Sequence, residues 1–140
     1  IVAIQETHWH GAAAAKWFNS FPGSRVLPSP AIRSAKHGLL GGVALIIPVG
    51  IAGTRSSVLV DAYGIECIAQ RGDLPQERFI SVYLPHQDRL GTLKKIADAT
   101  LKFDWNTFIG GDFNIDLDNP RDEEELGIAQ ELQRFLEEHG

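Results

Sequence analysis

Methionine is absent from this chain of 140 residues, and cysteine occurs only once. A single cysteine has no partner for a disulfide within the chain, and Cys67 lies between Ile65 and Ile68, a setting typical of a reduced core thiol. The chain opens with Ile1 and an apolar run typical of a buried strand, without an initiator methionine. We therefore expect a partial domain, and the sequence assigns no compartment because any targeting signal would lie outside it.

Acidic residues are absent from residues 7–60, where five basic residues give a charge of +5. Glu6 and the 17 acids against 8 bases of residues 61–140 bring the whole chain to −5. The acid-free stretch could seat a phosphate backbone next to a metal site. Five well-spaced cations are equally typical of an ordinary solvated surface, so both interpretations stay open. The cations are Lys16, Arg25, Arg33, Lys36 and Arg55.

Long hydrophobic runs are also missing. The longest apolar stretch, residues 38–53, falls short of the ~18–20 residues that a membrane-spanning helix needs, and Pro48 and several glycines interrupt it. We expect a buried strand there and no membrane association. The 44% content of hydrophobic residues is enough for a packed core, and no repeat or linker divides the chain, so residues 1–140 form a single unit.

Apolar periodicity predicts an α/β chain. Strands are expected over residues 1–5, 43–48, 57–62, 65–70, 79–84 and 107–109, and a short alanine-rich helix over residues 10–18. Residues 21–42 are dense in proline and glycine, which predicts a long irregular connection. A second helix is expected after Asp88 as N-cap, with Leu90, Leu93, Ala97 and Leu101 on its apolar face. Asn119 and Pro120 are expected to open the last helix.

The segment Gly110-Gly111-Asp112-Phe113-Asn114 carries the strongest functional signal. It places a carboxylate and an amide two residues apart at the end of an apolar, strand-like segment. Such side chains on rigid backbone suit metal-assisted attack on a phosphate.

Three further segments precede it in order: Ile4-Gln5-Glu6-Thr7, Gly41-Gly42-Val43-Ala44-Leu45-Ile46 and Val82-Tyr83-Leu84-Pro85. Together the four segments resemble the endonuclease/exonuclease/phosphatase superfamily, and most of all the apurinic-type endonuclease domains of non-LTR retrotransposons. The resemblance spans nearly the whole chain. It implies a part of the four-layer α/β/β/α sandwich of the DNase I-like fold, and it implies a Mg²⁺-dependent DNA endonuclease from a retrotransposon polyprotein. Lipid and inositol phosphate phosphodiesterases of the same superfamily stay an alternative.

The resemblance also implies roles for individual residues. Glu6 would ligate the catalytic Mg²⁺, for which Mn²⁺ could substitute, because a hard cation prefers carboxylate oxygen. Asp112 would orient and deprotonate the attacking water, and Asn114 would hold the phosphate and the Asp112 carboxylate. Tyr83 would donate to the phosphate as charge builds in the transition state.

The chain also departs from the family pattern. It has no asparagine-bearing strand before Glu6 and no terminal Asp-His pair, and Ser81 stands where the family commonly has asparagine. We therefore expect little or no nuclease activity from these 140 residues by themselves, and a non-catalytic remnant stays an alternative. An incomplete sandwich also predicts an unpaired sheet edge and marginal solubility. None of the five histidines, His8, His10, His37, His86 and His139, follows a Ser-Asp pair.

Plainer interpretations remain for each site residue. Glu6 could be a solvated charge at a strand end, Tyr83 a core aromatic, and Asp112 and Asn114 simple turn formers. A calcium loop of the EF-hand type over residues 112–123 is a remote alternative. The acids and amide needed at positions 1, 3, 5, 7 and 12 are present, but Leu117 replaces the turn glycine and the preceding segment is strand-like. These residues are Asp112, Asn114, Asp116, Asp118 and Glu123.

Overall fold

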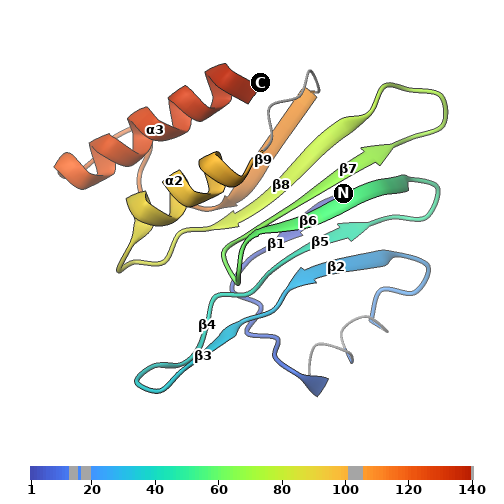
Figure 1. Ribbon diagram of the computed structural model, residues 1–140, viewed down its shortest axis with the longest axis horizontal. Coiled ribbons are helices and arrows are strands. Elements are labelled where there is room, and N and C mark those ends of the chain that lie inside the picture. The colour runs from blue at the N-terminus through green and yellow to red at the C-terminus, as the bar shows by residue number, and fades with distance from the viewer. Residues whose placement is uncertain (13–15, 17–19, 101–105, 140) are drawn as a thin grey trace.

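The computed structural model describes residues 1–139 except 13–15, 17–19 and 101–105, and it shows a mixed α/β chain (Figure 1). Helices α2 (Arg89–Ala99) and α3 (Glu123–His139) pack on one face of a four-stranded sheet. A three-stranded sheet packs on its other face. The predicted α/β class is therefore confirmed. Neither helix is long and apolar enough, over the part described, to cross a membrane.

The four-stranded sheet, here called the central sheet, contains β6 (Ala52–Val60), β7 (Gly64–Gln70), β8 (Glu77–Tyr83) and β9 (Asn106–Asp112) in that order. The first three strands form an antiparallel meander. Strand β9 instead runs parallel to β8, and α2 lies between them in the chain, as a parallel pair requires a crossover. Side chains alternate across the sheet: Cys67 packs toward the second sheet, whereas Ile80 and Val82 pack against the helices.

The second sheet, here called the N-terminal sheet, has the order β1 (Val2–Ile4), β5 (Val43–Ile47) and β2 (Arg25–Ser29). Strand β5 lies in the middle, and all five of its residues are buried. Between β2 and β5 the chain forms a hairpin of β3 (Ile32–Ser34) and β4 (Gly38–Leu40). The prediction of an irregular connection over residues 21–42 is therefore wrong. Pro28 is tolerated because β2 is an edge strand, where a missing N–H costs little.

Most of the other predicted strands agree with the structure. The expected segments 43–48, 65–70 and 79–84 coincide with β5, β7 and β8 within two residues, whereas β6 begins at Ala52, five residues before its expected start. Cys67 is a fully buried free thiol, as predicted, and burial raises its pKa. Most of the helix expected over residues 10–18 lies outside the described residues.

The two helix starts differ in how well the sequence predicted them. Asp88 occupies the N-cap of α2, but its side chain makes no capping hydrogen bond and pairs with Lys95 at 3.4 Å. Helix α2 ends at Ala99, and Leu101, expected on its apolar face, lies outside the described residues. Helix α3 does not start at Asn119 and Pro120. Its first turn is capped by Asp122, whose Oδ1 accepts the Glu125 N–H at 2.9 Å.

The wrong start predicted for α3 has a local cause. The Asp116 carboxylate accepts the backbone N–H groups of Asp118 (3.1 Å) and Asn119 (3.2 Å). This turn competes with helix formation and delays it until Asp122 can cap. The three glutamates at residues 123–125 then lie in the first turn, where the helix dipole favours negative charge.

Each sheet ends in an apolar edge strand. Strands β1 and β9 have a partner on one side only among the described residues, and Val2 and Phe108 are each about half exposed there. A hollow of about 240 Å³ lies between these two edges and is lined mainly by apolar side chains. Marginal solubility of the chain stays a prediction.

Gly111 permits the close approach of β9 to β8. A Cβ atom at Gly111 would lie 1.9 Å from the carbonyl oxygen of Val82, whereas one at Gly110 would meet nothing within 4 Å. We expect Gly111→Ala to lower the free energy of unfolding by at least about 2 kcal/mol, because strand backbone cannot move aside cheaply. Gly110→Ala is the matched control and should change it by less than about 1 kcal/mol. Urea denaturation measures both, and equal effects of the two variants would contradict the steric argument.

Candidate functional site

The parallel pairing of β8 and β9 brings Tyr83 and Asp112 to the same end of the central sheet. The two residues are partners in the strand register, and each is the last residue of its strand. Just beyond them, the N–H of Leu84 donates to the carbonyl oxygen of Asp112 at 2.9 Å. Two chain segments 29 positions apart therefore end side by side.

Glu6 joins this end of the sheet from the N-terminal sheet. The Tyr83 hydroxyl donates a 2.6 Å hydrogen bond to Glu6 Oε1, which links residues 77 positions apart. One step earlier, Gln5 Nε2 donates to the Ser81 hydroxyl at 3.1 Å, and Ser81 is fully buried. Ser81, which departs from the family pattern, thus forms a polar link between the segment after β1 and strand β8.

Two glycines allow the segment around Glu6 to lie where it does. The backbone N–H groups of Thr7 and His8 donate to the carbonyl oxygens of Gly42 (3.0 Å) and Gly41 (3.2 Å). A Cβ atom at Gly42 would lie 2.4 Å from Thr7 Oγ1. Both glycines also adopt positive φ, which residues with a side chain rarely do. The Gly41-Gly42 pair of the sequence motif therefore serves a packing role at the candidate site.

Burial and the neighbouring acidic side chains raise the pKa of Tyr83. Tyr83 is buried, and its pKa is raised to about 12, first by burial, then by the hydrogen bond and negative charge of Glu6, and then by the charge of Asp112. The Asn114 side chain acts in the opposite direction. Glu6, Asp112 and Asn114 thus all influence the pKa of the Tyr83 hydroxyl. The four residues that the sequence motifs singled out therefore lie together.

Asn114 is held by three hydrogen bonds. Its Nδ2 donates to the carbonyl oxygen of Leu84 at 2.8 Å, and its backbone N–H donates to Asp112 Oδ1 at 3.0 Å. Its own carbonyl oxygen accepts from Arg89 Nη1 at 2.9 Å. The bond between Asn114 and Asp112 is typical of a turn, but it also fixes the Asp112 carboxylate relative to the amide.

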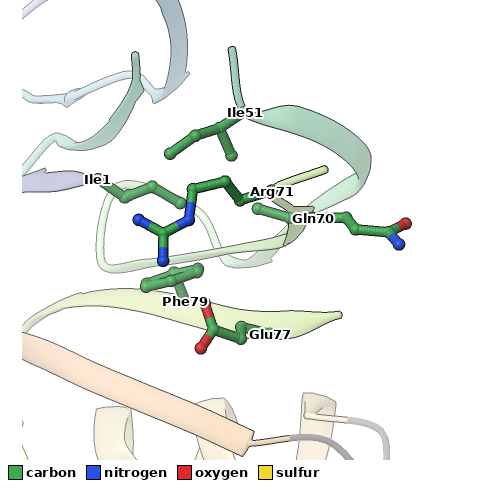
Figure 2. Close-up of a pocket in the computed structure, with 7 residues that line it drawn as sticks. Ile1, Ile51, Gln70, Arg71, Glu77 and Phe79 are labelled. Carbon is green, nitrogen blue, oxygen red and sulfur yellow. The ribbon is translucent and has the colours of Figure 1, made fainter. Parts of the chain in front are cut away.

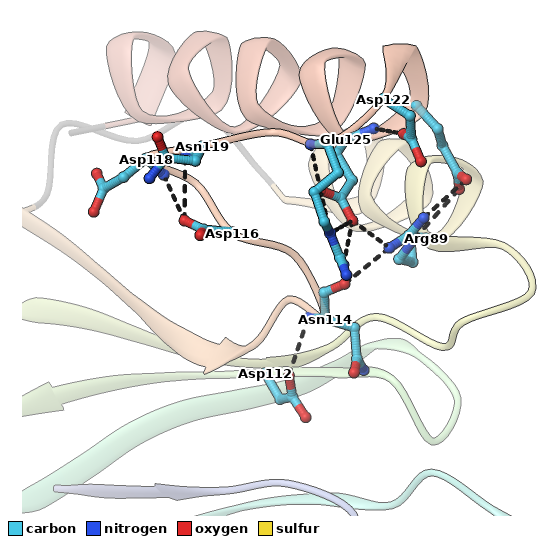
Figure 3. A network of polar contacts seen from close by, with 10 residues as sticks. Arg89, Asp112, Asn114, Asp116, Asp118, Asn119, Asp122 and Glu125 are labelled. Atoms are coloured by element: carbon cyan, nitrogen blue, oxygen red, sulfur yellow. Dashed lines mark hydrogen bonds and ion pairs between the residues drawn. The ribbon is translucent and has the colours of Figure 1, made fainter.

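Arg89 connects the site to the starts of both helices (Figure 3). It is the first residue of α2, is buried, and pairs with Glu124 at 2.9 Å and Glu125 at 3.3 Å. Glu125 is buried too and also binds Arg121, and this hydrogen bond with Arg121 is the main reason why its pKa falls to about 2. Arg89 belongs to none of the four sequence motifs. Its only signal was a basic residue at the start of a helix, where the helix dipole disfavours positive charge.

Backbone strain is concentrated at this site. Among the described residues, four that are not glycine have positive φ, and three of them are Glu6 (49°), His8 (51°) and Asn114 (52°). Such conformations are often found at functional sites, where the surrounding structure holds them.

A small hollow of about 90 Å³ opens next to Glu6 and Tyr83. His8, Tyr63 and His86 also line it, and the Tyr63 and Tyr83 rings stack with centroids 6.2 Å apart. A larger hollow of about 170 Å³ contains Arg71, Glu77 and Phe79 (Figure 2). It lies at the opposite end of β8, ~20 Å from Tyr83 at the usual rise per strand residue, and so is separate from the candidate site.

The donor set fits Mg²⁺ better than a metal that needs a complete protein cage. Within the described part of the chain, no group of three or more His, Cys, Asp or Glu side chains could hold a metal ion. Mg²⁺ is commonly held by one or two carboxylates together with water and substrate phosphate, and Glu6 and Asp112 are exposed oxygen donors of that kind. The structure does not fit the EF-hand alternative, because strand β9 leads into residue 112, where an EF-hand has a helix.

Comparison with known proteins adds no family to this description. No family model matches the chain, and no curated protein matches it significantly.

The pKa of Tyr83 provides a test of the site geometry that needs no activity. In a Tyr63→Phe background, Tyr83 is the only tyrosine, and its ionisation can be followed by ultraviolet absorbance. Glu6→Gln should lower its pKa from about 12, because removal of the neighbouring negative charge favours the phenolate. Asp112→Asn should lower it less. Asp73→Asn, an exposed acid in the loop between β7 and β8, is the control and should leave it unchanged, with circular dichroism verifying the folded state. An unchanged pKa in the Glu6 variant would contradict the contact.

Acid should weaken the network around Glu125. Its folded pKa of about 2 lies below the ordinary glutamate value of 4.5, so its contribution to stability is present above pH ~4.5 and is lost as the pH falls toward 2. Glu125→Gln should therefore be less stable than the parent at pH 7, and the difference should shrink between pH 4.5 and 2. Urea denaturation across this range measures the difference. Glu137→Gln, at an exposed position of the same helix, is the control, and its free energy of unfolding should change with pH as that of the parent does. If Glu125→Gln also changed with pH as the parent does, the network would not contribute to stability.

Proposed function

We propose that the chain belongs to a Mg²⁺-dependent phosphodiesterase that hydrolyses DNA by attack of water. The observation that carries this proposal is the convergence of Glu6, Tyr83, Asp112 and Asn114 at one end of the central sheet. Carboxylate, amide and hydroxyl groups in one place match the needs of phosphoryl transfer, which is mostly positioning and charge stabilisation. A bound Mg²⁺ would polarise a phosphoryl oxygen and stabilise the leaving oxygen.

Each residue has a role that its contacts support. Glu6 and Asp112 are the candidate ligands and proton acceptors, since both carboxylates are exposed to solvent. Asp112 would take the proton of the attacking water, with Asn114 holding its carboxylate through the 3.0 Å backbone bond. Tyr83, with its pKa raised to about 12, stays protonated at neutral pH and can donate to a phosphate oxygen.

DNA is favoured over lipid or inositol phosphates by the charge next to the site. The β3–β4 hairpin carries the exposed residues Arg33, Lys36 and His37 and no acid. Its last residue, Leu40, lines the same hollow as Glu6. Cations on a projecting hairpin next to the candidate metal ligands can follow a phosphate backbone on either side of a scissile bond. A retrotransposon-type endonuclease is the form of this function that the sequence motifs suggest.

A non-catalytic remnant is the second candidate. It is favoured by the small donor set, since the described residues offer no group of three metal-binding side chains. In that case the chain would retain the arrangement of the site and its affinity for DNA but would not hydrolyse it.

Metal binding and DNA nicking together test the proposal. Mn²⁺, as a paramagnetic substitute for Mg²⁺, should bind to the parent chain, and Glu6→Gln and Asp112→Asn should each weaken binding by about tenfold or more. Glu137→Gln should bind as the parent does. With the chain in excess over supercoiled plasmid, we expect slow nicking that requires Mg²⁺ and falls about 10²-fold in Asp112→Asn.

The two measurements separate the candidates. Equal Mn²⁺ affinity in the parent and both variants would overturn the shared metal site. Nicking that persists in EDTA or in Asp112→Asn would overturn the catalytic role of Asp112. Metal binding that requires both carboxylates, without any nicking, would favour the non-catalytic remnant.

A further inference from the structure

Helix α3 has more apolar surface than the face that packs on the central sheet. The buried face consists of Ile128, Leu132 and Phe135. On the outer side, Leu126 and Leu136 are 48% and 41% exposed. The apolar stripe of a surface helix normally faces its core, whereas here it widens beyond Leu132 to exposed leucines, which marks a surface that the described fold does not use.

The outer apolar side chains line a groove of about 460 Å³. It begins at Leu117 and Pro120 before the helix and follows α3 to Leu136. From Leu126 to Leu136 the axial distance is ~15 Å at 1.5 Å per residue, which corresponds to nearly three helical turns. An amphipathic helix lying in a groove uses anchors at i, i+3 or i+4 and i+7, which fit within this length.

The groove lies in a strongly acidic part of the chain. Residues 116–138 contain nine acidic and two basic residues, a net charge of −7. Both basic residues are already paired, Arg121 with Glu125 and Arg134 with Glu131 and Glu138. Positions 123, 126, 130, 133 and 137 follow one another at spacings of three and four, so the carboxylates of Glu123 and Glu137 lie along the same side of the helix as Leu126.

We propose that this groove binds a basic amphipathic helix of a separate protein. Apolar anchors of the partner would contact Leu117, Leu126 and Leu136, and its lysine or arginine side chains would face the acids along the groove. Charge complementarity decides the occupant, because a second copy of this chain would bring a like-charged α3 against α3. The groove shares no lining residue with the hollow next to Glu6 and Tyr83, because it lies on the helix layer and Glu6 lies beside the N-terminal sheet. The proposal therefore does not depend on the proposed function.

A synthetic peptide tests the proposal on the whole chain. The probe is a fluorescein-labelled amphipathic helix with leucines at i, i+3, i+4 and i+7 and lysines beside them, and fluorescence anisotropy measures its binding. The double variant Leu126→Gln/Leu136→Gln should raise the Kd by about tenfold or more. Leu74→Gln is the matched control, since Leu74 is 51% exposed in the loop between β7 and β8 and should leave the Kd unchanged. Because all three leucines are exposed, thermal melts should show the variants to be folded.

The charge and the occupant are tested separately. A peptide with glutamates in place of the lysines should bind about tenfold more weakly, and added salt should weaken the lysine peptide. Equal Kd values for the parent and the double variant, or for the two peptides, would overturn the proposal. A dimer in light scattering that the double variant dissociates would assign the groove to a second copy instead, and would also overturn it.

Discussion

The parallel pairing of β8 with β9 is the constraint on which the candidate site depends. Antiparallel strands joined by a short turn would have put the end of β9 at the far end of the sheet, away from Tyr83. The helical crossover through α2 instead brings both strand ends to one edge, and the register then sets Asp112 opposite Tyr83. A slip of one residue would turn every side chain of β9 to the other face. Gly111 makes the observed register possible, because its missing side chain leaves room for the Val82 carbonyl.

The fold divides the charge of the chain between opposite layers. The acid-free residues 7–60 supply most of the N-terminal sheet and the β3–β4 hairpin, whereas the acidic residues 116–138 supply α3 and the loop before it. The central sheet lies between these layers. The uneven charge that is visible along the sequence therefore becomes two surfaces of opposite sign, one next to the candidate site and the other along α3.

Sequence patterns were most informative where local and tertiary preferences agree. The apolar runs of β5, β7 and β8 predicted buried strands because those segments are buried in any arrangement of the sheets. Strand β2 was missed since Pro28 is a local signal against strands, and only pairing with β5 makes this edge position favourable. Glu66 and Arg78 show the same limit. Their charges predict exposed positions, yet they are buried together 3.7 Å apart in the central sheet.

The sequence motifs identified the candidate site residues, whereas the contacts that hold these residues in place became visible only in the structure. The motifs singled out Glu6, Tyr83, Asp112 and Asn114, and these residues lie together. Nothing local to the motifs could indicate that Arg89 holds the Asn114 carbonyl, or that Gln5 binds Ser81, because those contacts join segments far apart in the chain. The roles of the four residues in hydrolysis remain proposals.

The left-handed backbone at Glu6, His8 and Asn114 sets stability and chemistry against each other. A residue with a Cβ atom in this conformation costs about 1–2 kcal/mol relative to glycine, although asparagine, as at Asn114, is tolerated better than most other residues. Glycine at Glu6 or Asn114 would relieve this strain, but it would leave the buried Tyr83 hydroxyl without its acceptor or remove the bond to the Leu84 carbonyl. The side chains that carry the proposed chemistry therefore also hold the strained backbone in place.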